Sequence, residues 1–519
     1  MRNRCFLAFA LACLSVAPLA VSQNVMSINK VPGQIESKAQ RLTHALQKQG
    51  FEVNRGYFKM WGVEQCQYTF DIVGLCFGNN PAAPYITLAA PPWPNEFVYS
   101  KISSVLGPSL PGYNDVFRLD HNEAIIILAQ MPPPARFFSE QSWVFTRRGT
   151  IDTTSATYQE VASNPSSSPL LSVFFRNVPG ISDRILSFSS LSNPVNNAVI
   201  KNQSSAAFDE QRYFIITPDD FMNQAVRKAF AGISVADQDI FTEPIPSSEA
   251  IIGLDEAADD FLTLIRYAQP DDGGEAGTPS AKWRNDLPMV VLRVRETRHE
   301  PKPYTAPLVY ATRTATNELS LAPDLDNLLV AVARRWGQPC AEADCSDRLT
   351  PPSVDFQGSP LHAIGTLCRP IGEDCLGDNW DASYEILGPP KSLDNGEIYA
   401  VAGPLGTETG NATYVGLSIN RASLLEGIQN LSDKVLAGTA SAYAGEVSNA
   451  SKFYLYYFTR NCSGLESFTN GNCFQIDEAM IAPGDRLVLV IRDYLRPGTE
   501  RGPDSSLLLL PKGIVLHRP

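Results

Sequence analysis

The apolar positions near the start of the chain repeat at the spacing of an α-helix. Ile35, Ala39, Leu42 and Leu46 follow one another at intervals of four, three and four residues. This spacing places them on one face of a helix, and Gly50 stands where that helix is expected to end. Similar patterns predict two further helices, at residues 323–336 and 422–436.

Short runs rich in apolar, β-branched and aromatic residues, separated by Pro- and Gly-rich turns, predict strands along most of the chain. The expected strands are residues 68–73, 85–88, 124–128, 143–145, 212–216, 239–242, 261–267, 289–294, 397–402, 413–419, 453–459 and 486–491, and residues 170–175 are either loop or strand. Residues 487–491 are apolar at every position. This pattern favours a central strand that is covered on both faces.

Six consecutive large side chains occupy residues 453–458, in the order Phe-Tyr-Leu-Tyr-Tyr-Phe. In a strand, alternate side chains point to opposite faces. One face is therefore expected in a core. The other face lies either in a core as well, which is our prediction, or along a carbohydrate or lipid groove.

Residues 212–242 predict a strand, a helix and a second strand. The helix is expected to start at Thr217-Pro218-Asp219-Asp220, with Thr217 as the cap, proline in the first turn and acidic residues behind it. With the strands at 261–267 and 289–294, this order resembles a small ferredoxin-like or swivelling module. Such modules do not specify a function.

The fold class predicted from these elements is α+β, in several domains. Antiparallel β-rich parts form the N- and C-terminal regions, and a ferredoxin-like βα module lies between them. The expected boundaries are a signal peptide at 1–22, a β-rich domain with one N-terminal helix at 23–200, a βαβ-ββ module at 201–300 and an α+β domain with local disulfides at 301–519. A Ser-, Asn- and Pro-rich stretch at residues 164–205 suggests the boundary near 200.

The first 22 residues have the pattern of a secretory signal peptide. Arg2 and Arg4 precede an apolar run at residues 6–21, and Ala20-Val21-Ser22 offers small residues for cleavage. The run is shorter than a membrane span requires, and no later segment is apolar enough to serve as a transmembrane anchor. The sequence thus predicts a secreted soluble protein, either extracellular or, in a Gram-negative host, periplasmic.

Eight cysteines follow the expected signal peptide, and they fall into four close pairs. The pairs are Cys66/Cys76, Cys340/Cys345, Cys368/Cys375 and Cys462/Cys473. In an exported chain, an even number of cysteines indicates disulfides, and proximity favours these local pairs. The alternative is a zinc site formed by the two middle pairs, although their spacing is wider than that of zinc knuckles.

The chain is acidic, with a formal net charge of −13. Nucleic-acid binding depends on Lys and Arg, so no nucleic-acid partner is expected, and the charge also disfavours anionic membranes. Five Asn-x-Ser/Thr sequons make the chain a candidate glycoprotein in a eukaryotic host. They are at Asn202, Asn411, Asn430, Asn449 and Asn461.

The segment richest in polar residues runs from Glu373 to Asp381. Asp374, Asp378, Asn379 and Asp381 can supply oxygen ligands to a hard cation such as calcium, although their spacing is not that of an EF-hand. Alternatively, Asp378 and Asp381 act as a catalytic carboxylate pair. The simplest interpretation is a polar turn, for which Gly377-Asp378-Asn379 is ordinary composition.

His121 and Arg136 complete the catalytic candidates. Histidine titrates in the range useful for a general base, and Arg136, which lies between prolines and phenylalanines, can bind a carboxylate. Each also has a simpler role, as a surface histidine and as a salt bridge in a proline-rich loop. The five histidines show no metal-binding spacing, and neither a nucleophile elbow nor a phosphate-binding loop is present.

Two functions remain open for an unknown extracellular ligand or substrate. The first, slightly favoured by the size and mixed fold, is a secreted enzyme that uses carboxylate or histidine chemistry. It requires Asp378, Asp381, His121 and Arg136 to meet in one cleft. The second is a noncatalytic extracellular binding or structural protein.

Overall fold

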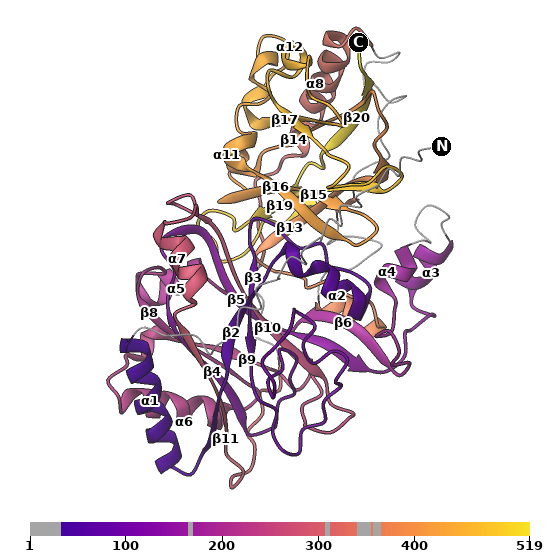
Figure 1. Cartoon of the computed structure of the whole chain (residues 1–519). Helices are drawn as coiled ribbons and strands as arrows, with labels where there is room; N and C mark the ends of the chain where they lie inside the picture. Colours follow the sequence, from indigo (N-terminus) through magenta and orange to yellow (C-terminus); the bar gives the residue numbers. More distant parts are fainter. Residues whose placement is uncertain (1–32, 164–169, 307–311, 340–353, 356–364) are drawn as a thin grey trace, which may run out of the picture.

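The computed structural model describes residues 33–163, 170–306, 312–339, 354–355 and 365–519. These residues form an α+β fold with four sheets, arranged in two lobes (Figure 1). The lower lobe contains two sheets from residues 33–306, and the upper lobe contains two sheets from the rest of the chain. No helix in the described ranges is long and apolar enough to cross a membrane.

The first sheet of the lower lobe has five strands. Their order is β1 (Glu52–Arg55), β11 (Met289–Arg295), β4 (Glu123–Gln130), β8 (Gln211–Thr217) and β9 (Ile240–Pro244). Helices α1 (Gly33–Lys48) and α6 (Asp220–Ala231) cover one face of this sheet. The apolar stripe predicted for α1 is buried there, so that helix is confirmed.

The second sheet packs against the other face of the first and encloses the main core of the lower lobe. Its order is β2 (Tyr57–Trp61), β3 (Tyr85–Ala89), β10 (Asp260–Pro270), β5 (Ala135–Arg148) and β6 (Arg184–Ser190), and β7 (Val195–Asn196) also pairs with β5. The remaining helices of this lobe are α2 (Cys66–Val73), α3 (Ala156–Ser163), α4 (Leu171–Phe174), α5 (Asn197–Ser204) and α7 (Pro279–Asp286).

The predicted βαβ unit is present as β8, α6 and β9, with the two strands parallel. Its helix is capped by Asp219 rather than Thr217, because the Asp219 side chain accepts from the Phe221 N–H. The two strands expected to complete the module lie in different sheets. Strand β11 is in the first sheet and β10 is in the second. Strands from residues 23–200 pair with strands from residues 201–300 in both sheets, so the two segments build the same pair of sheets.

The upper lobe is a pair of sheets with a shared core. One has the order β12 (Val354–Asp355), β13 (Ala382–Ser392), β19 (Arg486–Tyr494), β15 (Tyr414–Arg421) and β16 (Glu426–Ser432), and the other has the order β18 (Cys473–Gln475), β17 (Phe453–Thr459), β14 (Glu397–Pro404) and β20 (Lys512–His517). Helix α8 (Ala322–Arg335) packs on the outer face of the second of these sheets. The short helices are α9 (Gly365–Cys368), α10 (Gly406–Thr409), α11 (Asp433–Leu436) and α12 (Glu466–Thr469).

One strand prediction for this lobe is confirmed in part and another in full. Strand β19 is central, between β13 and β15, and Leu487, Leu489 and Ile491 lie in the core between the sheets, whereas Val490 on the other face is only partly buried. Strand β17 is buried along its whole length, with Phe453, Leu455 and Tyr457 in the core beneath α8 and Tyr454, Tyr456 and Phe458 in the core between the sheets. Both faces of β17 are therefore core, and neither is a groove.

Three secondary-structure predictions are wrong. Residues 68–73 belong to helix α2, where Cys66, Thr69 and Val73 are buried at helical spacing. Residues 170–175 contain the short helix α4. Residues 422–436 form a turn, the strand β16 and the short helix α11. The leucines in this last segment are spaced as in a helix, but pairing with β15 fixes the backbone as a strand.

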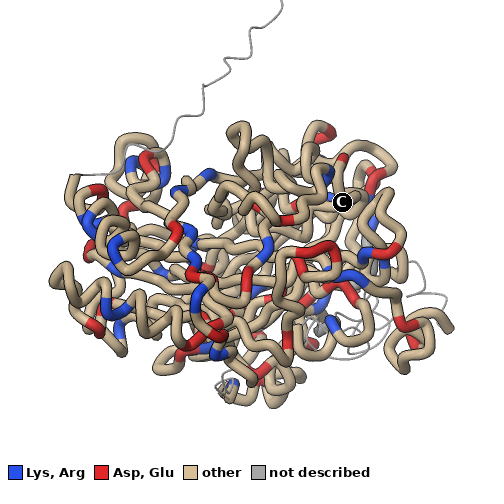
Figure 2. The backbone as a smooth tube through the Cα atoms, turned by 90° about the horizontal axis from the view of Figure 1, so that it is seen from below, with Lys and Arg blue, Asp and Glu red and all other residues tan. Residues whose placement is uncertain are grey.

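Three of the four predicted disulfides are present: Cys66–Cys76, Cys368–Cys375 and Cys462–Cys473. The fourth pair, Cys340 and Cys345, lies outside the described residues, as does the predicted signal peptide. Basic and acidic residues are intermixed along the chain in the view of Figure 2.

Candidate functional site

The acidic segment at 373–381 connects the two lobes. It runs beside β6 of the lower lobe, where the preceding helix α9 also packs (Figure 1). Asp378 is buried and accepts hydrogen bonds from the Ser190 N–H at 2.7 Å, the Ser190 hydroxyl at 2.6 Å and the Gly365 N–H at 2.8 Å. Burial raises the pKa of Asp378, and these donors oppose that shift.

The other polar residues of this segment turn toward different partners. Asp374 forms an ion pair with Arg176 at 3.5 Å. Asp381 accepts from the Asn196 amide at 2.7 Å and lies 3.5 Å from Arg501, and burial raises its pKa to about 6. Asn379 accepts from the backbone N–H of Asp381. The predicted calcium ligands therefore do not surround one point, and the described residues contain no group of three metal-binding side chains.

His121 and Arg136 do not join the carboxylates. Both are exposed, whereas Asp378 and Asp381 are buried between the lobes. His121 precedes β4 and Arg136 follows it, so the eight residues of β4 separate them by roughly 20 Å. The four predicted catalytic residues thus do not meet in one cleft. The structure therefore offers no catalytic site composed of these four residues.

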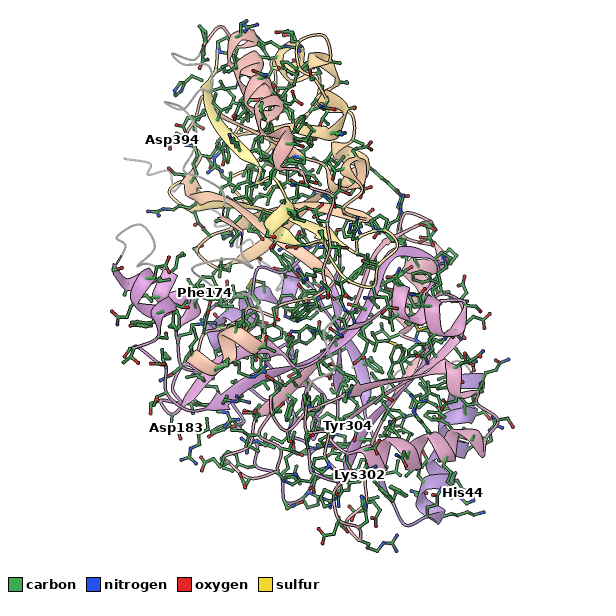
Figure 3. The ribbon with its side chains drawn as sticks, turned by 180° about the vertical axis from the view of Figure 1, so that it is seen from behind. His44, Phe174, Asp183, Lys302, Tyr304 and Asp394 are labelled. Atoms are coloured by element: carbon green, nitrogen blue, oxygen red, sulfur yellow. A yellow bond between two sulfur atoms is a disulfide. The ribbon has the colours of Figure 1, made fainter. Side chains whose placement is uncertain are left out.

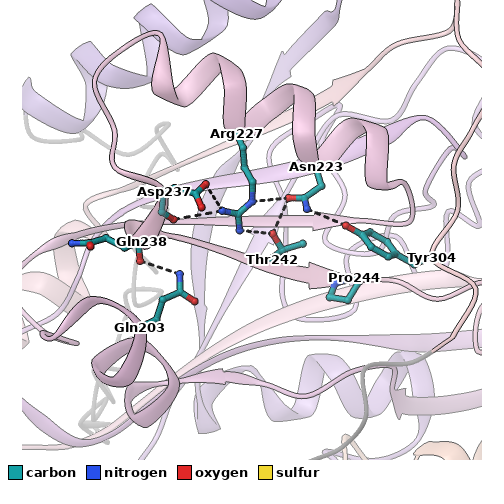
Figure 4. Close-up of a pocket in the computed structure, with 8 residues that line it drawn as sticks. All are labelled: Gln203, Asn223, Arg227, Asp237, Gln238, Thr242, Pro244 and Tyr304. Atoms are coloured by element: carbon teal, nitrogen blue, oxygen red, sulfur yellow. Dashed lines mark hydrogen bonds and ion pairs between the residues drawn. The ribbon is translucent and has the colours of Figure 1, made fainter.

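The structure instead places an open cavity of about 600 Å³ on the βαβ unit of the lower lobe (Figure 4). It is lined by Gln203 of α5, Asn223 and Arg227 of α6, Asp237, Gln238, Thr242 and Pro244 of the segment ending in β9, and Tyr304. We call this cavity the α6–β9 pocket. Its volume is within the range of small-molecule sites.

Arg227 organises one side of the pocket. Its guanidinium donates to Asp237 at 2.6 Å, to the Asn223 amide oxygen at 3.1 Å and to the Thr242 hydroxyl at 2.9 Å. A further bond to the backbone carbonyl of Ile240, at 3.0 Å, ties α6 to the start of β9. The charge of Arg227 is therefore balanced by Asp237, and the N–H groups of its guanidinium link the residues of the pocket wall to one another.

Tyr304 closes the opposite side of the pocket. Its hydroxyl accepts from the Asn223 side-chain amide at 3.0 Å, and burial raises its pKa to about 12. The segment that carries Tyr304 crosses the N-terminal end of α6, where the backbone N–H of Tyr304 donates to the Pro218 carbonyl at 2.9 Å. Figure 3 shows Tyr304 and Lys302 close together in the lower lobe.

His299 fixes the same segment. Its Nδ1 lies 2.8 Å from a Glu296 oxygen, and its Nε2 lies 3.1 Å from Asp219, the residue that caps α6. The ring also packs on Phe221. His299 was not among the predicted site residues, because 80 residues separate it from Asp219 and no sequence spacing links them.

The pocket offers hydrogen bonds rather than an unbalanced charge. Its lining includes three side-chain amides and two hydroxyls, and Pro244 adds an apolar surface. Among the described residues, none forms a hydrogen bond with the side-chain amide of Gln238, which lies at the rim of the pocket and extends away from the other lining residues in Figure 4, while the Gln238 backbone carbonyl accepts from Gln203 at 2.9 Å. The lining contains no histidine or cysteine, and its one carboxylate, Asp237, is paired with Arg227.

None of the pocket residues was singled out from the sequence. They come from α5, α6, the turn before β9, β9 itself and the segment after β11, and all but Pro244 are common polar residues without a motif. The only sequence signal was the βαβ pattern itself, because the ends of parallel strands are frequent positions for ligand sites.

The comparisons with known proteins do not assign this site. No family model matches the chain, and the curated proteins include no match. A solved structure described as an uncharacterized protein from Burkholderia cenocepacia is similar, at 10% sequence identity, with 93% of this chain and 87% of that chain covered and a TM-score of 0.36. A likeness at this TM-score assigns neither fold nor function.

Proposed function

We propose that this chain is a secreted, noncatalytic binding protein whose α6–β9 pocket holds a neutral, hydrogen-bonding small molecule. The observation that carries the proposal is the composition of the pocket wall. Amides and hydroxyls line the cavity, and the two charged side chains are paired with each other. A charged ligand gains no counter-charge there, whereas a polyhydroxylated molecule such as a sugar can share hydrogen bonds with the lining amides and hydroxyls, which bond to one another in this structure.

Secretion is part of the same proposal. The basic and apolar residues at 2–22 support it, and so do the three disulfides, which are characteristic of oxidising compartments. The disulfides close short loops, of 7 to 11 residues in sequence separation, so each constrains a local turn more than it joins distant parts of the chain.

The charge preference can be tested with three sugars that share one ring. Saturation-transfer NMR would compare glucose, which is neutral, with glucuronate and glucosamine, which carry opposite charges. We expect signal transfer to glucose and less than one third of that transfer to either charged sugar. No transfer to glucose, or equal transfer to all three, would contradict the proposal.

Gln238→Ala tests the place of binding. The substitution removes an exposed amide that has no partner within the described structure, so folding should not change. We expect glucose affinity to fall about three- to tenfold, the effect of roughly one hydrogen bond. Gln40→Ala, which removes an exposed glutamine of α1, a helix that contributes nothing to the pocket lining, is the matched control, and it should bind glucose like the unmodified protein.

A further inference from the structure

A buried pair of acidic side chains lies directly behind one wall of the α6–β9 pocket. Strand β9 presents Thr242 and Pro244 to the pocket. Glu243, between them, points the opposite way into the core between the two sheets of the lower lobe, together with its neighbours Phe241 and Ile245. Glu140 of β5 lies beside Glu243 in that core, and neither side chain is more than 2% exposed.

The hydrogen bonds around the two carboxyl groups are unequal. Glu243 accepts from the Ser142 N–H at 2.8 Å, the Ser142 hydroxyl at 2.6 Å and the Ser192 hydroxyl at 2.8 Å. Glu140 has no such donor on either oxygen among the described residues. This arrangement suits an ionised Glu243 and a protonated Glu140 that donates to it, because two buried carboxylates side by side repel each other.

No cation in the described structure faces this pair. The elements around it contribute uncharged groups: Ser142 on β5, Thr263 on β10 and Ser192 in the loop before β7. The nearest strand cations are directed elsewhere, since Arg266 of β10 stacks on Trp143 on the other face of the sheet and Arg147 of β5 pairs with Asp259. Burial and the neighbouring Glu243 both raise the pKa of Glu140.

We propose that the proton shared by Glu140 and Glu243 holds β9 in place and thereby makes ligand binding in the α6–β9 pocket depend on pH. Among the described strands, β9 is the edge of its sheet and pairs with β8 alone, so repulsion behind it acts against one strand partner and the side-chain bonds from Arg227 and Gln203. The inference rests on the proposed function, because it concerns regulation of the same pocket. Its ligand is the neutral molecule described above.

The direction in which the stability of β9 changes with pH follows from proton linkage. Because the folded state holds the proton more tightly than the unfolded chain, the stabilisation is complete below the ordinary glutamate pKa of about 4.5. It is lost progressively as pH rises from that value through the raised pKa of the pair. For one proton, the opening equilibrium of β9 increases by up to tenfold for each pH unit in this window.

Hydrogen exchange of the β9 amides measures that opening without any ligand. After correction for intrinsic exchange rates, we expect β9 protection in the full-length protein to fall at least tenfold between pH 5 and pH 8. In Glu140→Gln, whose amide donates to Glu243 at every pH, protection should change less than threefold. Glu140→Met, which also removes the titrating group, provides a second variant if the glutamine form does not fold.

A matched control comes from the upper lobe. Asp493 is buried near Glu318, and burial together with Glu318 raises its pKa, so Asp493→Asn removes a comparable acid outside the lower lobe. That variant should retain the pH response of β9. A pH-independent β9 in the unmodified protein, or an unchanged pH response in both Glu140 variants, would overturn the inference.

Glucose affinity measured at pH 5 and pH 8 separates this inference from the proposed function. Tighter binding at pH 5 that becomes pH-independent in Glu140→Gln supports both. Glucose that binds equally well at both pH values overturns the regulation. If β9 responds to pH and glucose binds at neither value, the proposed function fails, while the proton linkage of the strand stands.

Discussion

Replacing Glu123 by alanine will lower the free energy of unfolding by about 3–5 kcal/mol. Glu123 is buried at the start of β4 and forms an ion pair with the buried Arg293 of β11. It also accepts from the Trp93 indole at 2.9 Å and from the Asp120 N–H at 2.9 Å. The substitution leaves the Trp93 indole, the Asp120 N–H and the Arg293 Nε–H without their acceptor at a buried position, which is costly, although Arg293 keeps its second ion pair, with Glu96 at 2.7 Å.

Urea unfolding followed by tryptophan fluorescence measures this loss. Glu36→Ala is the control, because Glu36 pairs with Arg55 at 2.6 Å but about a quarter of its side chain is exposed. That change should cost less than 1 kcal/mol. If the Glu123 and Glu36 variants lose the same free energy of unfolding, the buried Glu123–Arg293 ion pair does not stabilise the lower lobe more than a surface pair does, and the prediction is wrong.

Asp378→Ala will lower the free energy of unfolding by about 2–4 kcal/mol and weaken the attachment of the upper lobe. The carboxylate of Asp378 is the common acceptor for Ser190 on β6 and Gly365 on α9. Its loss leaves two buried backbone donors without partners. The gain from no longer burying the carboxylate acts in the opposite direction, and the hydrogen bonds from Ser190 and Gly365 reduce it.

Asp378→Asn preserves the shape and one acceptor oxygen, so it should cost less than the alanine variant. Asp183→Asn is the surface control, since Asp183 is half exposed and pairs with the exposed Arg148 at 3.2 Å. Unfolding should become less cooperative in Asp378→Ala, with the two lobes melting in separate steps. A single transition at the unmodified midpoint would exclude this role.

Local patterns were enough to predict several elements. The stripe of α1, the apolar run of β19 and the alternation in β17 each report burial on faces that a helix or strand has by its own geometry. Residues 422–436 show the limit of that reasoning. Their leucines have helical spacing, but pairing with β15 decides the backbone conformation, and a strand partner is not visible in a local window.

The candidate sites were harder to predict for a related reason. The sequence identified Asp378 and Asp381 as important polar positions, and they are, but as partners of Ser190 and Asn196 rather than of each other. Those contacts span about 190 residues of sequence. The α6–β9 pocket is also assembled by tertiary structure, because its lining runs from Gln203 to Tyr304 and depends on the pairing of β8 with β9.

Binding in the α6–β9 pocket is tested most directly by NMR of the side-chain amides during a glucose titration, with asparagine and glutamine labelled with ¹⁵N. We expect saturable shifts of the amides of Gln203, Asn223 and Gln238, with one common affinity, while Gln40 and Asn196 do not move. Saturable shifts confined to amides outside the α6–β9 pocket, or no shifts at any glucose concentration, would contradict the proposed binding site.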